Sequence, residues 1–177
     1  MKRDHSDIQK EVKKRGFEIF CSDIFQQIKG QKHHNVTVGT HCIGVAEDCV
    51  RIADALERIG LHADRDVLVR ASLCHDLGML NRDQMYRSDF ESWRKHPKVS
   101  LKNARQAVSY LSEKEKDCIR HHMWPFLLSP PRTLEGFIVC FADKKSSFRE
   151  VFRKKGKTLT REYEGWITAI RDDVHLR

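Results

Sequence analysis

The stretch ASLCHDLGML, residues 71–80, constrains the fold more than any other part of the chain. In it, an apolar run leads directly into the adjacent pair His75 and Asp76. Such a run is typical of a buried helix, and burying a carboxylate is costly unless a positive partner holds it. A metal ion is the partner that histidines elsewhere in the chain would share. We therefore expect the chain to fold around a buried metal site.

Apolar residues recur at helical spacing along most of the chain. The clearest pattern runs from Val38 to Ile59 and advances by three or four residues along one face, with His41 near its start. Asp64 can cap the next helix, whose body over residues 67–77 is apolar on nearly every side. Because no alternating pattern favours a sheet, the sequence predicts an all-α bundle of about six to eight helices.

Two other segments have weaker signals for helices. Residues 6–28 indicate one or two helices, interrupted at Gly16. Residues 81–93 are polar with scattered aromatics, which predicts a loop with a short helix and makes this segment the best candidate for a lid. Helix formation is expected to resume at His96 and Pro97, since proline suits the first helical position.

The second half of the chain supplies three more predicted helices. A capping box over residues 112–115 starts a helix that ends with the adjacent pair His121 and His122. A second nearly all-apolar helix then runs into Asp143, which repeats the pattern seen at Asp76. A final amphipathic helix is expected over residues 158–175.

Composition limits the class of protein. The 177 residues suit one domain, 1–177, with a ligand-bearing core over about 31–150 and flanking helices at 6–29 and 158–175. The net charge of +8 favours anionic ligands, but 25 acidic residues are interspersed with the basic ones, so a nucleic-acid partner is not favoured. The six cysteines form no CxxC pair, which fits a cytoplasmic setting, and no apolar run approaches the roughly 20 residues of a membrane span.

The histidines and aspartates at the predicted helix ends follow an order that resembles a known family. HCIGVA resembles the first-histidine helix of the HD-domain metal-dependent phosphohydrolase superfamily, and SLCHDLG resembles its HD signature. HPKVSLKNA is similar to its third-histidine helix and CFADKKSSF to its final-aspartate helix. The similarity covers roughly residues 31–150, and the chain looks closest to small stand-alone bacterial members. The resemblance implies an HD-domain-like helical bundle.

The resemblance also implies a two-metal site. One divalent ion would bind His41, His75, Asp76 and Asp143, and a second would bind His96, His121 and His122, with Asp76 bridging the two. Mixed imidazole and carboxylate donors suit Fe, Mn, Zn or Ni, with Mg as a further possibility, better than calcium. Adjacent residues on an ideal helix point about 100° apart, so the histidine pair binds one ion only if the helix ends or distorts there. Otherwise only one of the two histidines binds the ion, and the other positions a ligand or contacts the substrate.

Helper residues are less clearly marked. Many relatives place a charged residue just after the HD pair, whereas this chain has Leu77 to Leu80 there. Lys144 could supply positive charge to a phosphate, as could Arg82 and Lys145, although the latter two are more typical of a solvated surface. His34 could donate a proton to the leaving oxygen. Together with Asp76, we therefore name Lys144 and His34 as candidate catalytic residues.

Three functions follow from these expectations. The leading one is a phosphohydrolase that cleaves a phosphate ester or anhydride of a small metabolite, with a nucleotide as the expected substrate class and a metal-bridging hydroxide as nucleophile. A di-iron oxygenase of the same fold is the first alternative, and a binding or regulatory module with an idle metal site is the second. Aromatic residues near the ligand positions could stack on a base, although core packing is the commoner role; they are Trp93, Trp124, Phe126 and Phe148.

Overall fold

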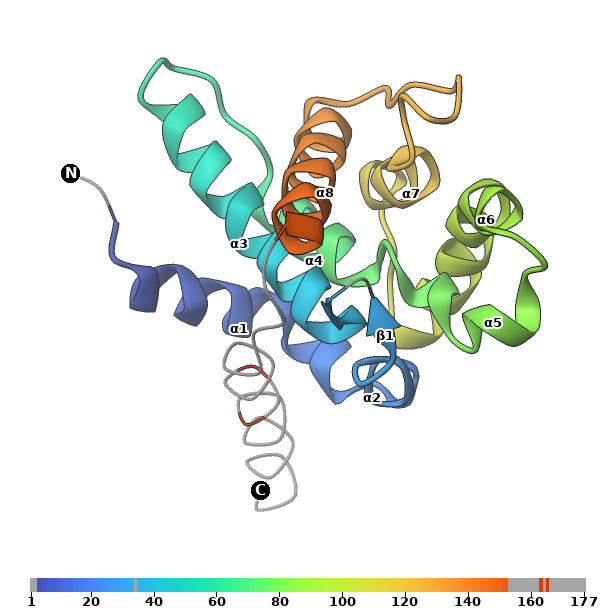
Figure 1. Ribbon diagram of the computed structural model, residues 1–177. Helices are drawn as coiled ribbons and strands as arrows, with labels where there is room; N and C mark the ends of the chain where they lie inside the picture. The colour runs from blue at the N-terminus through green and yellow to red at the C-terminus, as the bar shows by residue number, and fades with distance from the viewer. Residues whose placement is uncertain (1–2, 34, 153–162, 164, 166–177) are drawn as a thin grey trace.

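Helix α4 (Arg65–Cys74) lies at the centre of the molecule, as its apolar sequence predicts (Figure 1). The computed structural model describes residues 3–33, 35–152, 163 and 165. Helix α4 packs against α1 (His5–Cys21), α3 (Val38–Glu57), α6 (Asp89–Ala107), α7 (Glu113–His121) and α8 (Leu134–Phe152). Seven of its ten residues are buried. The Asp64 side chain caps it by accepting from the backbone N–H groups of Asp66 and Val67.

The described residues form an all-α architecture, which confirms the predicted fold class. Eight α-helices lie between residues 3 and 152, and the remaining two are the short α2 (Asp23–Ile28) and α5 (Arg82–Met85). A 3-10 turn, η1 (Leu77–Met79), directly follows the His75 and Asp76 pair. None of the helices in this part of the chain has the length and apolar character needed to cross a bilayer.

The break in the first helical segment falls at Ser22 and not at Gly16, where the sequence indicated it. Helix α1 continues through Gly16 because the residue is buried against α4. A Cβ at this position would lie 2.3 Å from a methyl carbon of Leu73, so glycine permits the close approach of the two helices. Ser22 ends α1 and caps α2, since its hydroxyl accepts from the backbone N–H of Phe25.

Two very short strands precede α3, although no sheet was expected. Strands β1 (Lys32–His33) and β2 (Val36–Thr37) pair in antiparallel fashion, with His33 opposite Val36. Lys32 is exposed whereas His33 is buried. Two-residue strands cannot show an alternating pattern in the sequence, which is why they were not predicted. The hairpin turns the His33 side chain into the interior.

Helix α6 begins seven residues earlier than the sequence indicated, at Asp89 and not at His96. Ser88 is its N-cap, because its hydroxyl accepts from the backbone N–H of Glu91. Pro97 therefore lies inside the helix and not at its first position. The cap at Ser88 is a stronger start signal than the proline. Most of the polar segment 81–93 is accordingly helical, in α5 and in the first turn of α6.

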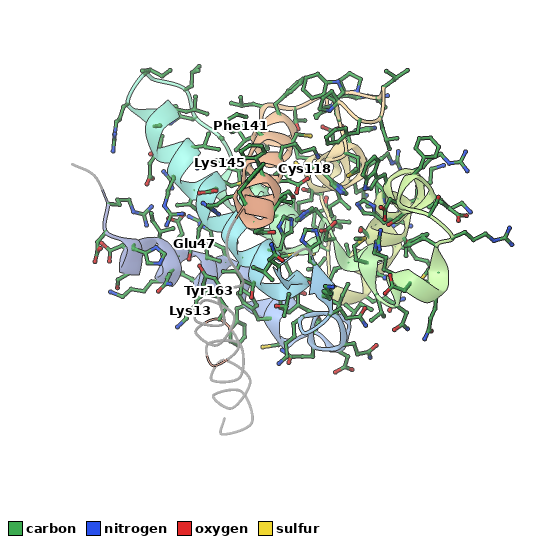
Figure 2. All side chains as sticks on the ribbon, viewed as in Figure 1. Lys13, Glu47, Cys118, Phe141, Lys145 and Tyr163 are labelled. Carbon is green, nitrogen blue, oxygen red and sulfur yellow. The ribbon has the colours of Figure 1, made fainter. Side chains whose placement is uncertain are left out.

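The C-terminal half follows the predicted order. The capping box of α7 is present, with Ser112 and Glu115 each accepting from the other's backbone N–H. Helix α8 packs along α3 and α7 and carries Asp143 in its middle. The helix predicted over residues 158–175 lies outside the described residues except for Tyr163 and Gly165. Figure 2 shows Tyr163 beside Glu47 of α3, to whose carboxylate the phenol donates a hydrogen bond of 3.1 Å.

Candidate metal centre

Three buried histidines have the same local geometry. In each, Nδ1 lies 2.7–2.9 Å from a backbone carbonyl oxygen three or four residues earlier in the chain. A carbonyl oxygen only accepts, so Nδ1 must carry the proton, and in the neutral ring Nε2 is left with a free lone pair. This is the arrangement that orients an imidazole as a metal ligand. The pairs are His75 with Ser72, His96 with Ser92, and His122 with Ile119.

The first cluster of donor atoms joins α3, the end of α4 and α8. Nε2 of His41 lies 3.3 Å from Nε2 of His75 and 3.2 Å from Oδ1 of Asp143. Nε2 of His75 is 3.7 Å from the same carboxylate oxygen. All three side chains are buried, so their ligand atoms meet in a space shielded from solvent. This group has the size of a coordination sphere.

The second cluster joins α6 to the end of α7. Nε2 of His96 and Nε2 of His122 are only 2.7 Å apart, and they lie 3.3 Å and 3.7 Å from Oδ1 of Asp76. Helix α6 supplies His96 one turn into its buried stretch, and His122 is the C-cap of α7. The second cluster is also buried.

Asp76 stands between the two clusters. Its Oδ1 faces the second cluster, whereas its Oδ2 lies 3.7 Å from Nε2 of His41 and 3.6 Å from Nε2 of His75 in the first. Asp76 follows His75, which is the C-cap of α4. Its backbone angles are φ −107° and ψ 14°, and the chain turns there into η1. One carboxylate therefore offers a separate oxygen to each cluster.

The electrostatics of the centre favour charged carboxylates. Burial raises the pKa of Asp76, but the charge of His75 and the hydrogen bond from His96, when these rings are protonated, outweigh it and hold the pKa well below its usual range. Burial also opposes ionisation of Asp143, whose pKa Lys144 and the neighbouring histidines hold well below its usual range. In contrast, burial and neighbouring His96 and His75 push the pKa of His122 well below its usual value.

The donor set fits metal ions. A neutral His96 and a neutral His122, each with its proton on Nδ1, present two lone pairs to each other at 2.7 Å, and such a contact is repulsive unless a cation or a proton lies between them. Buried nitrogen and carboxylate donors of this kind suit borderline ions such as Fe, Mn, Zn or Ni.

Glu150 supports the first cluster, although the sequence analysis did not single it out. Both of its carboxylate oxygens lie 3.0 Å from Nδ1 of His41, which donates to them, and the hydroxyl of Ser146 donates to Oε1 at 3.0 Å. Burial lowers the pKa of His41, but its hydrogen bonds to Asp143 and Glu150 outweigh this effect and raise the pKa to about 10. Glu150 follows Asp143 by seven residues on α8, a spacing of two helical turns that could have marked it.

His33 is the second residue that the sequence did not single out. Its ring stacks on that of His41 with centroids 4.1 Å apart, and its Nε2 lies 3.5 Å from Oδ2 of Asp76. Its Nδ1 lies 3.4 Å from Oε2 of Glu150. The sequence instead indicated the neighbouring His34, which lies outside the described residues. Successive residues of a strand point to opposite sides, and the sequence of a two-residue strand does not show that His33 is the buried one.

The structure places His121 apart from both clusters. Its Nδ1 contacts Oδ1 of Asp117 at 2.8 Å, one turn earlier on α7, and no group of donor atoms found among the described residues includes it. Helix α7 stays regular to His121, so the two adjacent rings diverge and only His122 faces the centre.

Of the three cationic residues that the sequence suggested as helpers, one lies at the centre and two do not. Lys144 reaches the centre, because its ammonium group donates to the backbone oxygen of His122 and lies 2.8 Å from Oδ2 of Asp143. Arg82 pairs with acidic residues of α5 and α6, and Lys145 lies 3.2 Å from Asp48 of α3. Of these cations, Lys144 alone contacts a residue of the two clusters in the part of the chain that the structure describes.

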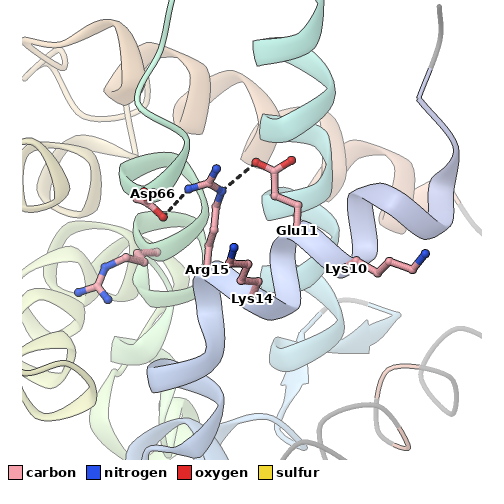
Figure 3. A pocket seen from close by; sticks show the side chains of 6 residues that line it. Lys10, Glu11, Lys14, Arg15 and Asp66 are labelled. Atoms are coloured by element: carbon pink, nitrogen blue, oxygen red, sulfur yellow. Dashed lines mark hydrogen bonds and ion pairs between the residues drawn. The ribbon is translucent and has the colours of Figure 1, made fainter.

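A separate hollow lies between α1 and α4 (Figure 3). It has a basic lining, but Arg15 is held by two carboxylates, at 2.8 Å from Glu11 and 2.6 Å from Asp66. The hollow does not contact the donor clusters. We attribute its charges to the packing of α1 on α4.

The fold and the buried His and Asp clusters place the chain in a known class. The family model for the HD domain matches residues 38–147, so the chain belongs to the HD domain family. That family consists mostly of metal-dependent phosphohydrolases. No curated protein and no solved structure matches the chain.

Proposed function

We propose that the chain is a metal-dependent phosphohydrolase that cleaves a phosphate ester or anhydride of a small metabolite, with nucleotides as the first substrate class to test. The observation that carries the proposal is the position of Asp76, whose two oxygens face two separate histidine clusters. When bound, two divalent ions would lower the pKa of a water molecule and hold both the attacking and the leaving oxygens of a phosphoryl group.

Each residue of the two clusters would bind an ion. His41, His75 and Asp143 would hold the first ion, and His96 and His122 the second. Asp76 would contribute one oxygen to each.

Other groups would position these ligands and the substrate. Glu150 would fix the ring of His41 and keep its Nε2 directed at the ion. Lys144 lies at the edge of the centre, where its ammonium group can attract the phosphate and neutralise part of its charge. His33 faces the same space as His41, so it can hydrogen-bond a phosphate oxygen there.

A phosphate-release screen tests the proposal. The full chain, supplied with Mn²⁺ or Fe²⁺, should release phosphate from at least one member of a set of nucleotides, sugar phosphates and cyclic dinucleotides. Asp76→Asn should lower that rate by at least about 100-fold, because it removes the charge that both ions share. Asp83→Asn, which alters an exposed carboxylate on α5, is the matched control and should not change the rate.

Two outcomes of the screen would contradict the proposal. No phosphate release from any compound, together with oxygen uptake by the iron form, would favour the di-iron oxygenase. A fully metal-loaded protein that neither releases phosphate nor consumes oxygen would favour a binding module.

A further inference from the structure

Two exposed aromatic side chains lie three and four residues along the chain from proposed ligand histidines. Trp93 precedes His96 by three residues on α6, and Phe126 follows His122 by four residues after α7. Their rings stack on each other, with centroids 5.7 Å apart and planes inclined by 27°. Trp93 is 44% exposed and Phe126 is 62% exposed, so the pair lies at the surface and not in the core.

Lys144 connects the aromatic pair to the metal centre. Its ammonium nitrogen is 5.7 Å from the centroid of Phe126, within the range of a cation–π contact. The same nitrogen is 2.8 Å from Oδ2 of Asp143, a proposed ligand of the first ion. The three side chains come from α6, from the segment after α7 and from α8, the same parts of the chain that supply His96, His122 and Asp143.

We propose that Trp93 and Phe126 form the stacking surface for a nucleobase, with Lys144 between the base and the phosphate. This inference rests on the proposed function and narrows its substrate class to compounds that carry a planar base. The exposed aromatic faces can stack on the planar base of a nucleotide, and the charged groups beside them can bind its phosphate. The two distances from the Lys144 nitrogen, 5.7 Å to the Phe126 centroid and 2.8 Å to Oδ2 of Asp143, place the aromatic pair beside the metal centre.

Stacking predicts a defined selectivity. An aromatic ring removed from a base-stacking surface typically weakens binding by roughly tenfold or more per base. Removing a ring should weaken the binding of ligands that carry a base. It should not change the binding of ligands that end at the sugar, because the metal centre and not the rings holds their phosphate. Electrostatic attraction alone would instead affect both kinds of ligand equally.

The test compares two phosphonates that a phosphohydrolase cannot cleave. One is the 5′-phosphonate analogue of adenosine monophosphate, and the other is the matching analogue of ribose 5-phosphate. Their dissociation constants are measured by calorimetry on the full chain with Mn²⁺. Wild type should bind the adenosine compound at least tenfold more tightly, and Trp93→Ala and Phe126→Ala should each remove most of that preference.

Two further variants separate stacking from structural damage. Trp93→Phe keeps a flat ring and should retain most of the preference. Phe17→Ala removes a ring of similar exposure, 47%, from α1 and should leave the preference unchanged. Equal affinity of wild type for the two compounds, or an undiminished preference in both alanine variants, would overturn the inference. Failure of the proposed function would appear separately, as absent phosphate release in the screen.

Discussion

Gly78→Ala should lower the free energy of unfolding and distort the second cluster, because η1 packs tightly against α6. A Cβ at Gly78 would lie 2.3 Å from the backbone oxygen of His96 and 2.8 Å from the backbone nitrogen of Ser100. Neither atom can rotate away as the end of a side chain can, so α6 must shift. The added methyl group also disturbs the hydrogen bond that the Gly78 N–H donates to the Ser100 hydroxyl at 2.8 Å.

The expected loss follows from these two contacts. Overpacking typically costs 1 to 3 kcal/mol, and a lost hydrogen bond about 1 kcal/mol more, so we expect the free energy of unfolding to fall by about 3 kcal/mol. Because His96 lies on the displaced helix, the affinity for the second ion should also fall, by about tenfold or more. Urea denaturation in the presence of a chelator measures the stability, and metal titration measures the affinity.

Gly30→Ala is the matched control. A Cβ at Gly30 has no neighbour within 4 Å, so this variant should stay within about 1 kcal/mol of wild type. The reasoning would be refuted if Gly78→Ala were as stable as Gly30→Ala and bound the second ion as tightly as wild type.

Three further predictions concern single side chains. His122→Ala should bind only one ion, whereas His121→Ala should still bind two, as metal analysis of the purified variants would show. Glu150→Gln should weaken the affinity for the first ion by about 10- to 100-fold, measured by competition with a chelator; unchanged affinity would argue against its positioning role. Burial raises the pKa of Glu135, but the hydrogen bonds from Lys114 and from the backbone N–H of Asp64 outweigh it and hold the pKa below its usual 4.5. This ion pair therefore adds stability above pH 4.5 that is lost as the pH falls through the lowered pKa, and Glu135→Gln should flatten the acid side of the stability curve.

The sequence predicted the helices well where the local signals were strong. The capping box at Ser112 and the apolar stripe that begins at Val38 correspond to α7 and α3. The two errors have different causes, a tertiary contact at Gly16 and a competing local signal near Pro97. Gly16 reads as a helix interruption in isolation, but its lack of a side chain is required by packing against Leu73. Pro97 reads as a helix start, but a second local signal, the cap at Ser88, sets the start about two turns earlier.

The candidate site shows the same division. Helix ends are visible in the sequence, so the positions of His75 and Asp76 at the end of an apolar helix were predictable. The direction of a side chain relative to another helix is not visible in the sequence. The pattern therefore does not show that the His33 side chain points into the interior. It also gives no signal that Glu150 reaches across from α8 to α3, because that contact depends on how the helices pack.

The central claim is that Asp76 bridges two metal ions, and metal analysis of two proteins tests it most directly. Wild type prepared with Mn²⁺ or Fe²⁺ should contain about two ions per chain. Asp76→Ala should lose most of both, because the two oxygens of this carboxylate face different clusters. Loss of only one ion, or retention of both, would contradict the bridging assignment.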